Sequence, residues 1–404
     1  MELQLTELLN LPGVVVEWSR NFGQELILDV EIDAPFASCP HCQEVSHHLH
    51  QNHGYLVRDL PFGEKQVYLR VNRRQFKCKN CEKPFSEELN FVGRRKKYTH
   101  RYAKHITEQV VNSDLHNVAR RNCLTEPEVE SMINHVSQQV LPVNLKSLKR
   151  LGIDEISLVK GQSKYVVVLV DLDRGKLVGL VKERKLKSIE KFLISWGDET
   201  LGQIEEVSMD LYKLYKSVVE KLCPNAVVTV DRFPVTKLLN EELNQGRIDQ
   251  KKTAESLEIE PRKKIFNSLK GCKYVLLKRE SNLKKEQKEK LLEVKEASPV
   301  IGVMHELKEE FTQIFDESKN LGEGTFKLIE WLKKAQPFFR KTVQTIKNWF
   351  AEIVGYFEQG TTNGMVEGIN NRLKVLKRCG FGFRNFENFE KRALLLWHLA
   401  DSLA

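Results

Sequence analysis

Residues 151–181 read LGIDEISLVKGQSKYVVVLVDLDRGKLVGLV, and the class of the fold follows from them. They hold three apolar runs rich in β-branched residues, and Arg174-Gly175 supplies the turn between the last two. Downstream, segments in which apolar residues have helical spacing alternate with further strand-like runs. The predicted elements are strands at 151–159, 165–171, 176–181, 204–209 and 226–230, and helices at 188–196 and 214–222. The sequence therefore predicts an α/β domain with the element order βββαβαβ.

Two aspartates occupy particular places in this order. Asp154 lies in the first strand, and Asp210 directly follows the fourth. The order is that of a ribonuclease-H-like mixed sheet, in which the first strand is central and the fourth lies beside it. We therefore expect the two carboxylates to be neighbours. Asp231 ends the fifth strand, one position further away, and is a supporting or alternative ligand, whereas Glu155 should point to the opposite face of its strand.

A third acid comes from Thr361-Thr-Asn-Gly-Met-Val-Glu367-Gly-Ile-Asn370-Asn371-Arg-Leu-Lys374, at the start of a basic helix. On a helix, the acid, the two amides and the ammonium of this stretch share one face. Two aspartates on strands and a glutamate on a helix are what two-metal phosphoryl transfer on nucleic acid requires. Mg2+ or Mn2+ suits this all-oxygen site, because adjacent carboxylates repel one another unless cations neutralise them.

The segment between Asp231 and Glu367 is far too long for a loop. It is rich in Lys, Glu and Leu, as in 282–293 and 326–334, which is typical of solvated helices. We predict a large helical insertion at 241–355, which interrupts a ribonuclease-H-like catalytic domain made of residues 146–240 and 356–404.

Two C-x-x-C knuckles lie in the N-terminal part of the chain. They are Cys39-Pro-His-Cys42 and Cys78-Lys-Asn-Cys81, so four thiolates can complete a closed tetrahedral shell around zinc. Between them, Val67, Leu69 and Val71 alternate with polar residues, which predicts a half-buried strand. Residues 1–92 are therefore predicted to form a small β zinc ribbon domain, held together by a structural zinc ion at Cys39, Cys42, Cys78 and Cys81.

A basic run follows the ribbon, and its five cations suggest contact with the DNA backbone. They are Arg94, Arg95, Lys96, Lys97 and Arg101. Two short helices come next, at 114–121 and from Thr125 onward, where Thr125 and Glu128 form a capping box. The pair resembles a helix-turn-helix, so 93–145 is a candidate DNA-binding region. A purely structural helical linker is the alternative.

Composition agrees with a nucleic-acid partner. Among the 404 residues, 64 Lys and Arg stand against 55 Asp and Glu, which gives a formal charge of +9. A basic excess favours a polyanion. No apolar run approaches the roughly 18 residues of a membrane span, and the start lacks the basic character of a signal peptide. The sequence therefore predicts an intracellular protein with no membrane contact.

Several motifs together resemble the bacterial insertion-sequence transposases of the ISL-three type. Besides the knuckles and the glutamate helix, they are Arg73-Arg-Gln-Phe-Lys77, Gly152-Ile-Asp-Glu155, Asp231-Arg-Phe233 and Gly380-Phe-Gly-Phe-Arg-Asn-Phe386. The resemblance covers nearly the whole chain in the family's order. Pro234 departs from the family, in which histidine usually follows D-R-F, and so does the segment after Met209.

This resemblance implies a DDE transposase with a zinc ribbon, a helix-turn-helix and a ribonuclease-H-like catalytic domain. Carried over by position, Asp154, Asp210 and Glu367 would be the catalytic acids, with Asp231 in the D-R-F motif. Such an enzyme binds terminal inverted repeats in double-stranded DNA, cleaves the element ends and transfers them to target DNA, and we expect a homodimer assembled on DNA. The residues expected to hold the DNA backbone near the site are Asn371, Lys374, Lys377, Arg378 and Arg384.

Two other classes of protein remain open from the sequence. The chain could be a catalytically inactive DNA-binding protein derived from a transposase. It could instead be a structure-specific nuclease of ribonuclease-H type, which would cleave branched DNA without strand transfer.

Overall fold

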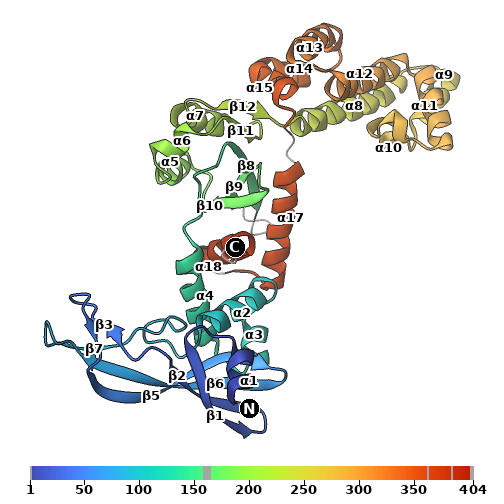
Figure 1. The fold of residues 1–404 in the computed structure, drawn as a ribbon. Helices are drawn as coiled ribbons and strands as arrows, with labels where there is room; N and C mark the ends of the chain where they lie inside the picture. Colours follow the sequence, from blue (N-terminus) through green and yellow to red (C-terminus); the bar gives the residue numbers. More distant parts are fainter. Residues whose placement is uncertain (1, 158–164, 362–363, 384, 401–404) are drawn as a thin grey trace. The chain divides into compact units, whose positions relative to one another are not determined.

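The computed structural model describes residues 2–157, 165–361, 364–383 and 385–400. The chain divides into two compact units (Figure 1). The first contains Met1–Val143 and Val375–Ala404, and the second contains Asn144–Lys374. The predicted domains group the C-terminal residues 356–404 with the sheet at 146–240 instead.

The first unit begins with helix α1 (Glu2–Leu9) and a five-stranded sheet, in which four strands follow the order β1-β2-β6-β5 and β7 pairs with β6. Val67, Leu69 and Val71 on β6 have no exposed surface, which confirms the predicted alternation. Strands β1 and β2 were not predicted, and they make this sheet larger than a minimal ribbon. The strand bounds are β1 Val14–Phe22, β2 Glu25–Ile32, β5 Leu49–Phe62, β6 Lys65–Lys77 and β7 Pro84–Ser86, with a separate pair β3 Ala37–Ser38 and β4 Val45–Ser46.

Four helices complete the first unit: α2 His100–Val111, α3 Leu115–Arg121, α4 Glu126–Val140 and α18 Phe386–His398. The predicted helix pair is confirmed as α3 and α4. Thr125 caps α4, because its hydroxyl accepts from the backbone N–H of Glu128 while the Glu128 carboxylate accepts from the N–H of Thr125. Leu395 of α18 is buried in the same core as Ile106 of α2 and Met132 of α4. That burial explains why the C-terminal helix belongs to this unit.

The second unit contains a mixed sheet with the strand order β10-β9-β8-β11-β12. The pairings β8·β9 and β9·β10 are antiparallel, whereas β11 runs parallel to both β8 and β12. The predicted order of strands is confirmed, with β8 central. The bounds are β8 Arg150–Ser157, β9 Tyr165–Asp171, β10 Lys176–Val181, β11 Glu206–Met209 and β12 Val227–Val230, with helices α5 Leu186–Ile194, α6 Asp198–Gly202 and α7 Lys213–Leu222.

Every regular element from Phe233 to Gln359 is helical, as expected for the insertion. These helices share a core that contains Trp331 and Phe311, and α8 runs across the predicted boundary at residue 240. They are α8 Phe233–Ala254, α9 Ile259–Leu269, α10 Lys273–Leu277, α11 Lys285–Ala297, α12 Pro299–Glu317, α13 Leu321–Ala335, α14 Arg340–Asn348, α15 Phe350–Val354 and α16 Tyr356–Gln359, and α17 Gly364–Cys379 follows. Within the described ranges, no helix has the length and apolar character needed to cross a membrane.

Candidate active site and metal centre

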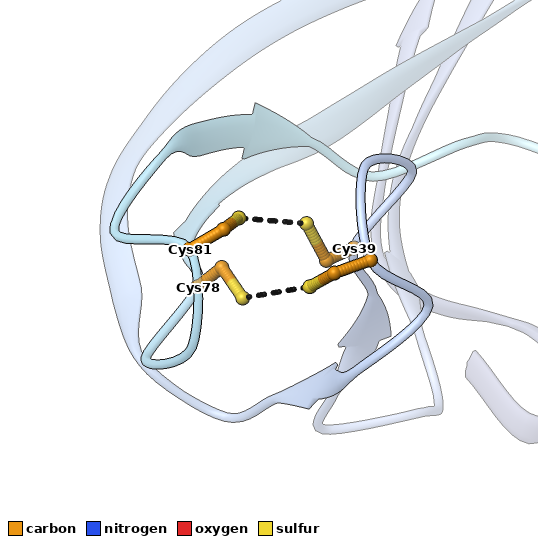
Figure 2. A group of neighbouring side chains, drawn as sticks. Cys39, Cys78 and Cys81 are labelled. Carbon is orange, nitrogen blue, oxygen red and sulfur yellow. Dashed lines mark hydrogen bonds between the residues drawn. The ribbon is translucent and has the colours of Figure 1, made fainter.

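The four predicted zinc ligands lie together in the first unit (Figure 2). The sulfur atoms of Cys39, Cys42, Cys78 and Cys81 all lie within 4.8 Å of one another. The Sγ atoms of Cys39 and Cys81 are 3.6 Å apart, and those of Cys42 and Cys78 are 3.5 Å apart. Backbone N–H groups of the second knuckle, that of Cys81 above all, lower the pKa of the Cys78 thiol to about 7. The cluster therefore has the donor set and the spacing of a closed structural zinc site.

Each knuckle is shaped by a residue in the left-handed conformation. Gln43 has φ 62° and Glu82 has φ 55°, and both directly follow a knuckle cysteine. The N–H of Gln43 donates to the carbonyl of Cys39 at 2.8 Å, which closes the first turn. The geometry that gathers the thiolates is thus fixed over a few neighbouring residues.

A second cluster forms where the parallel strands β11 and β12 end, beside the middle of β8. Met209 on β11 pairs with Ile153 on β8 and with Val230 on β12. The next residue on each strand is an aspartate, so Asp154, Asp210 and Asp231 follow in the same register. Side chains at this edge of a sheet converge on one site.

Helix α17 brings Glu367 to the same place because two glycines allow a close approach. A Cβ atom on Gly152 would lie 2.8 Å from a methyl group of Val366, and one on Gly175 would lie 2.8 Å from the sulfur of Met365. Any larger residue at either glycine would force the first turn of α17 away from β8 and the β9–β10 turn. Glu367 follows Val366 directly and is exposed.

The three aspartates are hard to ionise. Burial raises the pKa of all three, and it raises that of Asp210 to about 6 together with the charges of Asp154 and Asp231. The charge of Glu367 also raises the pKa of Asp231. These carboxylates therefore lie close enough to repel one another, as expected of groups that share a cation.

Asn370 orients one member of the cluster. Its Nδ2 donates to Oδ2 of Asp154 at 2.6 Å, across 216 positions of sequence. Its Oδ1 is buried without a hydrogen-bond partner among the residues described. Glu155 turns away, since one oxygen accepts from the Tyr215 hydroxyl at 2.6 Å and the other lies 3.3 Å from Arg184.

A cavity of about 520 Å³ connects the carboxylates to the helical insertion. Its acidic wall carries Asp154, Asp210, Asp231 and Glu367. The cavity is also lined by one face of α12, with side chains at spacings of three and four residues, and by two arginines. These further lining residues are Lys308, Phe311, Thr312, Phe315, Arg232 and Arg279.

The two arginines of the cavity are held by one acid. Asp316 at the end of α12 lies 2.7 Å from Arg232 and 2.8 Å from Arg279. Lys308 is almost fully buried and donates to the carbonyl oxygens of Leu276 and Lys278. None of these cations was predicted as a site residue: Arg279 and Lys308 stand in charged stretches, and Arg232 was named only within the D-R-F motif.

The predicted DNA-contacting residues of the first unit have different environments. Arg94, Arg95 and Lys97 are exposed, whereas Lys96 donates to the Ser131 hydroxyl at 3.1 Å. Arg101 is engaged inside the unit, where it pairs with the buried carboxylate of Asp59 and donates to the carbonyl oxygen of Leu9. The guanidinium of Arg101 therefore stabilises the fold of the first unit.

On α17, Asn371, Lys374 and Arg378 are exposed and Lys377 is half-buried. The charge of Lys374 lowers the pKa of Asp154, which puts this ammonium near the carboxylates. Arg384 lies outside the described residues.

Two family models match the chain, one over the N-terminal cysteines and one over most of the second unit and the C-terminal helices. A family model of DDE transposases of the ISL3 group, described as "Transposase", matches residues 151–393. A second model, described as "zinc-finger of transposase IS204/IS1001/IS1096/IS1165", matches residues 35–81. The first spans the strands that carry the aspartates and the helix that carries Glu367, and the second contains all four knuckle cysteines.

Two relatives are transposases by name. The transposase for insertion sequence element IS1001 of Bordetella parapertussis is 25% identical over 381 residues, which covers 93% of this chain and 92% of the relative. The transposase for insertion sequence element IS1557 of Mycobacterium tuberculosis is 29% identical over 259 residues, or 59% of this chain and 58% of the relative. The family resemblance is thereby confirmed: the chain belongs to the ISL3 family of insertion-sequence transposases, DDE enzymes that act on DNA and use divalent metal ions in catalysis.

Proposed function

We propose that Asp154, Asp210 and Glu367 are the catalytic acids with which this transposase cleaves DNA at the terminal inverted repeats of its element and joins the ends to target DNA. The observation that carries the proposal is the cavity lined by three aspartates from neighbouring parallel strands and by a glutamate on α17. The sheet order β10-β9-β8-β11-β12 supports a ribonuclease-H-like fold for residues 146–240 with the start of α17.

The donor set fits divalent cations. All four acids offer oxygen ligands, their mutual repulsion calls for positive charge, and the orphaned Oδ1 of Asn370 adds an unused acceptor close by. Mg2+ or Mn2+, when bound, would neutralise the carboxylates, activate the attacking oxygen and stabilise the leaving oxygen of the DNA backbone. We assign Asp231 a supporting or alternative ligand role.

The remaining side chains of the cavity prepare the site for a phosphodiester. Asn370 fixes the orientation of Asp154 through its hydrogen bond. Arg232 and Arg279, held by Asp316, line the same cavity as the acids, where their guanidinium groups would hold a DNA phosphate for in-line attack. On α17, Asn371, Lys374, Lys377 and Arg378 are proposed to contact the DNA backbone on either side, and Arg384 retains that role as a prediction.

DNA recognition is assigned to the first unit. The capped α3–α4 pair supports a helix-turn-helix, and the exposed Arg94, Arg95 and Lys97 support backbone contacts beside it. Because two element ends must be processed together, we propose that two copies assemble on DNA, in the cytoplasm at the nucleoid.

The test is a cleavage and strand-transfer assay on a plasmid that carries the element with its own ends. Asp154→Ala and Glu367→Ala should each lower both activities by at least about a thousandfold, with DNA affinity changed less than about threefold, because metal ligands act on the transition state. Asp198→Ala removes an exposed acid from α6 and serves as the matched control. Retained cleavage in Asp154→Ala would overturn the assignment, and cleavage of branched DNA without strand transfer would identify a structure-specific nuclease instead.

A further inference from the structure

A cavity of about 650 Å³ lies beside the zinc centre in the first unit, and three arginines line it. Arg73 comes from β6, and Arg94 and Arg95 come from the basic run. Pro40 and His41 of the first knuckle form another part of the wall. Segments that are far apart in the sequence thus bring three guanidinium groups to one cavity.

Arg73 occupies a position that the sheet would normally give to an apolar residue. Val67, Leu69 and Val71 on the same face of β6 are completely buried in the core. Arg73 continues this row at the next inward position, and its Nε is buried without a hydrogen-bond partner in the described parts of the chain. A guanidinium N–H that is shielded from water and unpaired indicates a missing acceptor.

Other arginines of the same unit are neutralised within the fold. Arg74, the neighbour of Arg73, lies 2.7 Å from the Glu87 carboxylate, and Arg20 lies 3.0 Å from that of Asp29. No ion pair is found for Arg73, Arg94 or Arg95 among the residues that the structure describes. Glu88 also lines the cavity, but it is exposed and balances at most one of the three charges. The lining of the cavity therefore carries a net positive charge.

We propose that this cavity binds a phosphate of the DNA backbone, so that the zinc knuckle and the basic run act as one DNA-binding surface. The inference rests on the proposed DNA recognition by the first unit. Guanidinium forks match the oxygens of a phosphodiester, and the hydroxyl groups of Tyr55 and Ser86 on the cavity wall add donors. Burial raises the pKa of Tyr55, which keeps its hydroxyl protonated.

Zinc has a direct part in this arrangement. Pro40 and His41 stand between the two cysteines of the first knuckle, so loss of the metal would free one wall of the cavity. Arg95 is held in the left-handed conformation, with φ 61°, which fixes where its side chain leaves the backbone. The cavity is therefore preformed by the metal-bound fold.

The experiment measures the affinity of the full-length, zinc-loaded protein for a 30-base-pair duplex of arbitrary sequence over a range of salt concentrations. Arg73→Gln and Arg95→Gln should each weaken binding roughly tenfold, and Arg73→Gln should reduce the slope of log K against log salt by about 0.9, the value of one lost phosphate contact. Arg20→Gln removes an equal charge from the same sheet at an internally paired position, and it should change affinity less than about twofold. Arg73→Lys keeps the charge and should preserve the slope while losing part of the affinity.

The outcomes separate this proposal from the proposed function. Zinc content and thermal melting show whether Arg73→Gln folds. If it does not, Arg95→Gln provides the test, because Arg95 is exposed. Wild-type slope and affinity in both Gln variants would overturn the cavity as a DNA site, while a wild-type protein that binds no duplex would overturn DNA recognition itself. Inorganic phosphate is titrated in parallel. If the wild type binds phosphate tightly, and Arg73→Gln abolishes that binding without changing DNA affinity, the cavity is a site for free anions instead.

Discussion

The four-cysteine centre and the four-carboxylate cavity are built in opposite ways. The cysteines come from two knuckles that each span four residues, and their four sulfurs lie within 4.8 Å of one another, enough to complete a tetrahedral shell. The carboxylates come from three strands and a distant helix, and they face a cavity of about 520 Å³. A closed shell of soft ligands stabilises a fold, whereas an open shell of oxygens leaves positions for a substrate.

The electrostatic environments differ in the same sense. Around Cys78, backbone N–H groups lower the pKa and favour the thiolate that zinc binds. Around Asp210, burial and neighbouring acids raise the pKa and disfavour the carboxylate. The first site is prepared by its own backbone, while the second is complete only with bound cations. We therefore expect damage to the first to act on stability, and damage to the second to act on catalysis.

The largest effect is expected from Cys78→Ser, which removes one zinc ligand. Structural zinc contributes on the order of 10 kcal/mol in small zinc modules, so the knuckle region should unfold and DNA binding should be lost. Elemental analysis and limited proteolysis measure this. Cys123→Ser, which alters an exposed cysteine outside the cluster, is the control and should retain one zinc ion per chain. Full zinc content in Cys78→Ser would contradict the role of Cys78 as a ligand of a structural zinc ion.

The next effect separates the second and third aspartates of the cavity. Asp210→Ala should abolish cleavage, a loss of at least about 4 kcal/mol in transition-state stabilisation, with zinc content and DNA binding intact. Asp231→Asn keeps size and hydrogen bonding and should cause only a partial defect. A fully active Asp210→Ala enzyme together with an inactive Asp231→Asn enzyme would transfer the ligand role to Asp231.

A smaller effect should appear in stability against pH. The folded state raises the pKa of Asp210 from 3.8 to about 6, so it holds the proton more tightly than the unfolded chain. The associated stability is complete below pH 4 and is lost as the pH rises to about 6, on the order of 2 kcal/mol after allowing for partial solvent exposure.

Thermal melting in buffer without divalent metal measures this loss. Above pH 6, Asp210→Asn should melt roughly 4–8 °C higher than the wild type, and below pH 4 the two should coincide. Excess Mg2+ should reverse the order above pH 6, because it binds only the wild-type carboxylate cluster well. Identical melting curves at pH 7 would show that the acids do not strain the fold.

The smallest effect concerns the glycine beneath α17. Gly152→Ala puts a methyl group 2.8 Å from Val366 and 2.9 Å from Leu172, which should cost about 1–3 kcal/mol and displace Glu367. Cleavage should fall roughly tenfold or more, because misplacement of a reacting group by about 1 Å is costly. Gly368→Ala, on the same helix with open space around it, should leave cleavage unchanged. Equal activity in the two variants would mean that α17 is not positioned by this contact.

Local sequence patterns were sufficient to predict the structure wherever neighbouring residues determine it. The C-x-x-C spacing predicted the zinc cluster, the Thr125–Glu128 pair predicted the start of α4, and the apolar runs predicted the five strands of the second unit. In each case the sequence signal lies in residues only a few positions apart. The family resemblance supplied the order of the modules.

The remainder depends on pairing across long distances. The register of β8, β11 and β12 aligns the aspartates, and it is set by backbone hydrogen bonds between these strands. No local sequence pattern specifies that pairing. Arg279 and Lys308 lie in charged stretches that look like any solvated helix, although the fold turns them toward the carboxylates. Arg73 was also missed: the alternation of Val67, Leu69 and Val71 predicts the inward face of the strand, but no local pattern shows that a cavity lies where Arg73 continues it.

The late position of α17 and α18 in the chain has a consequence for synthesis on the ribosome. The hydrogen bond from Asn370 joins it to Asp154, 216 positions earlier, and Arg392 donates to the carbonyl of Val110, 282 positions earlier. At about 5–20 residues per second, roughly 10 s to a minute separates the emergence of each early residue from that of its partner. Through this interval a nascent chain already holds its zinc ligands but has neither a complete carboxylate cluster nor a closed helical core. The cleavage activity therefore arises only after nearly all of the described chain has been made.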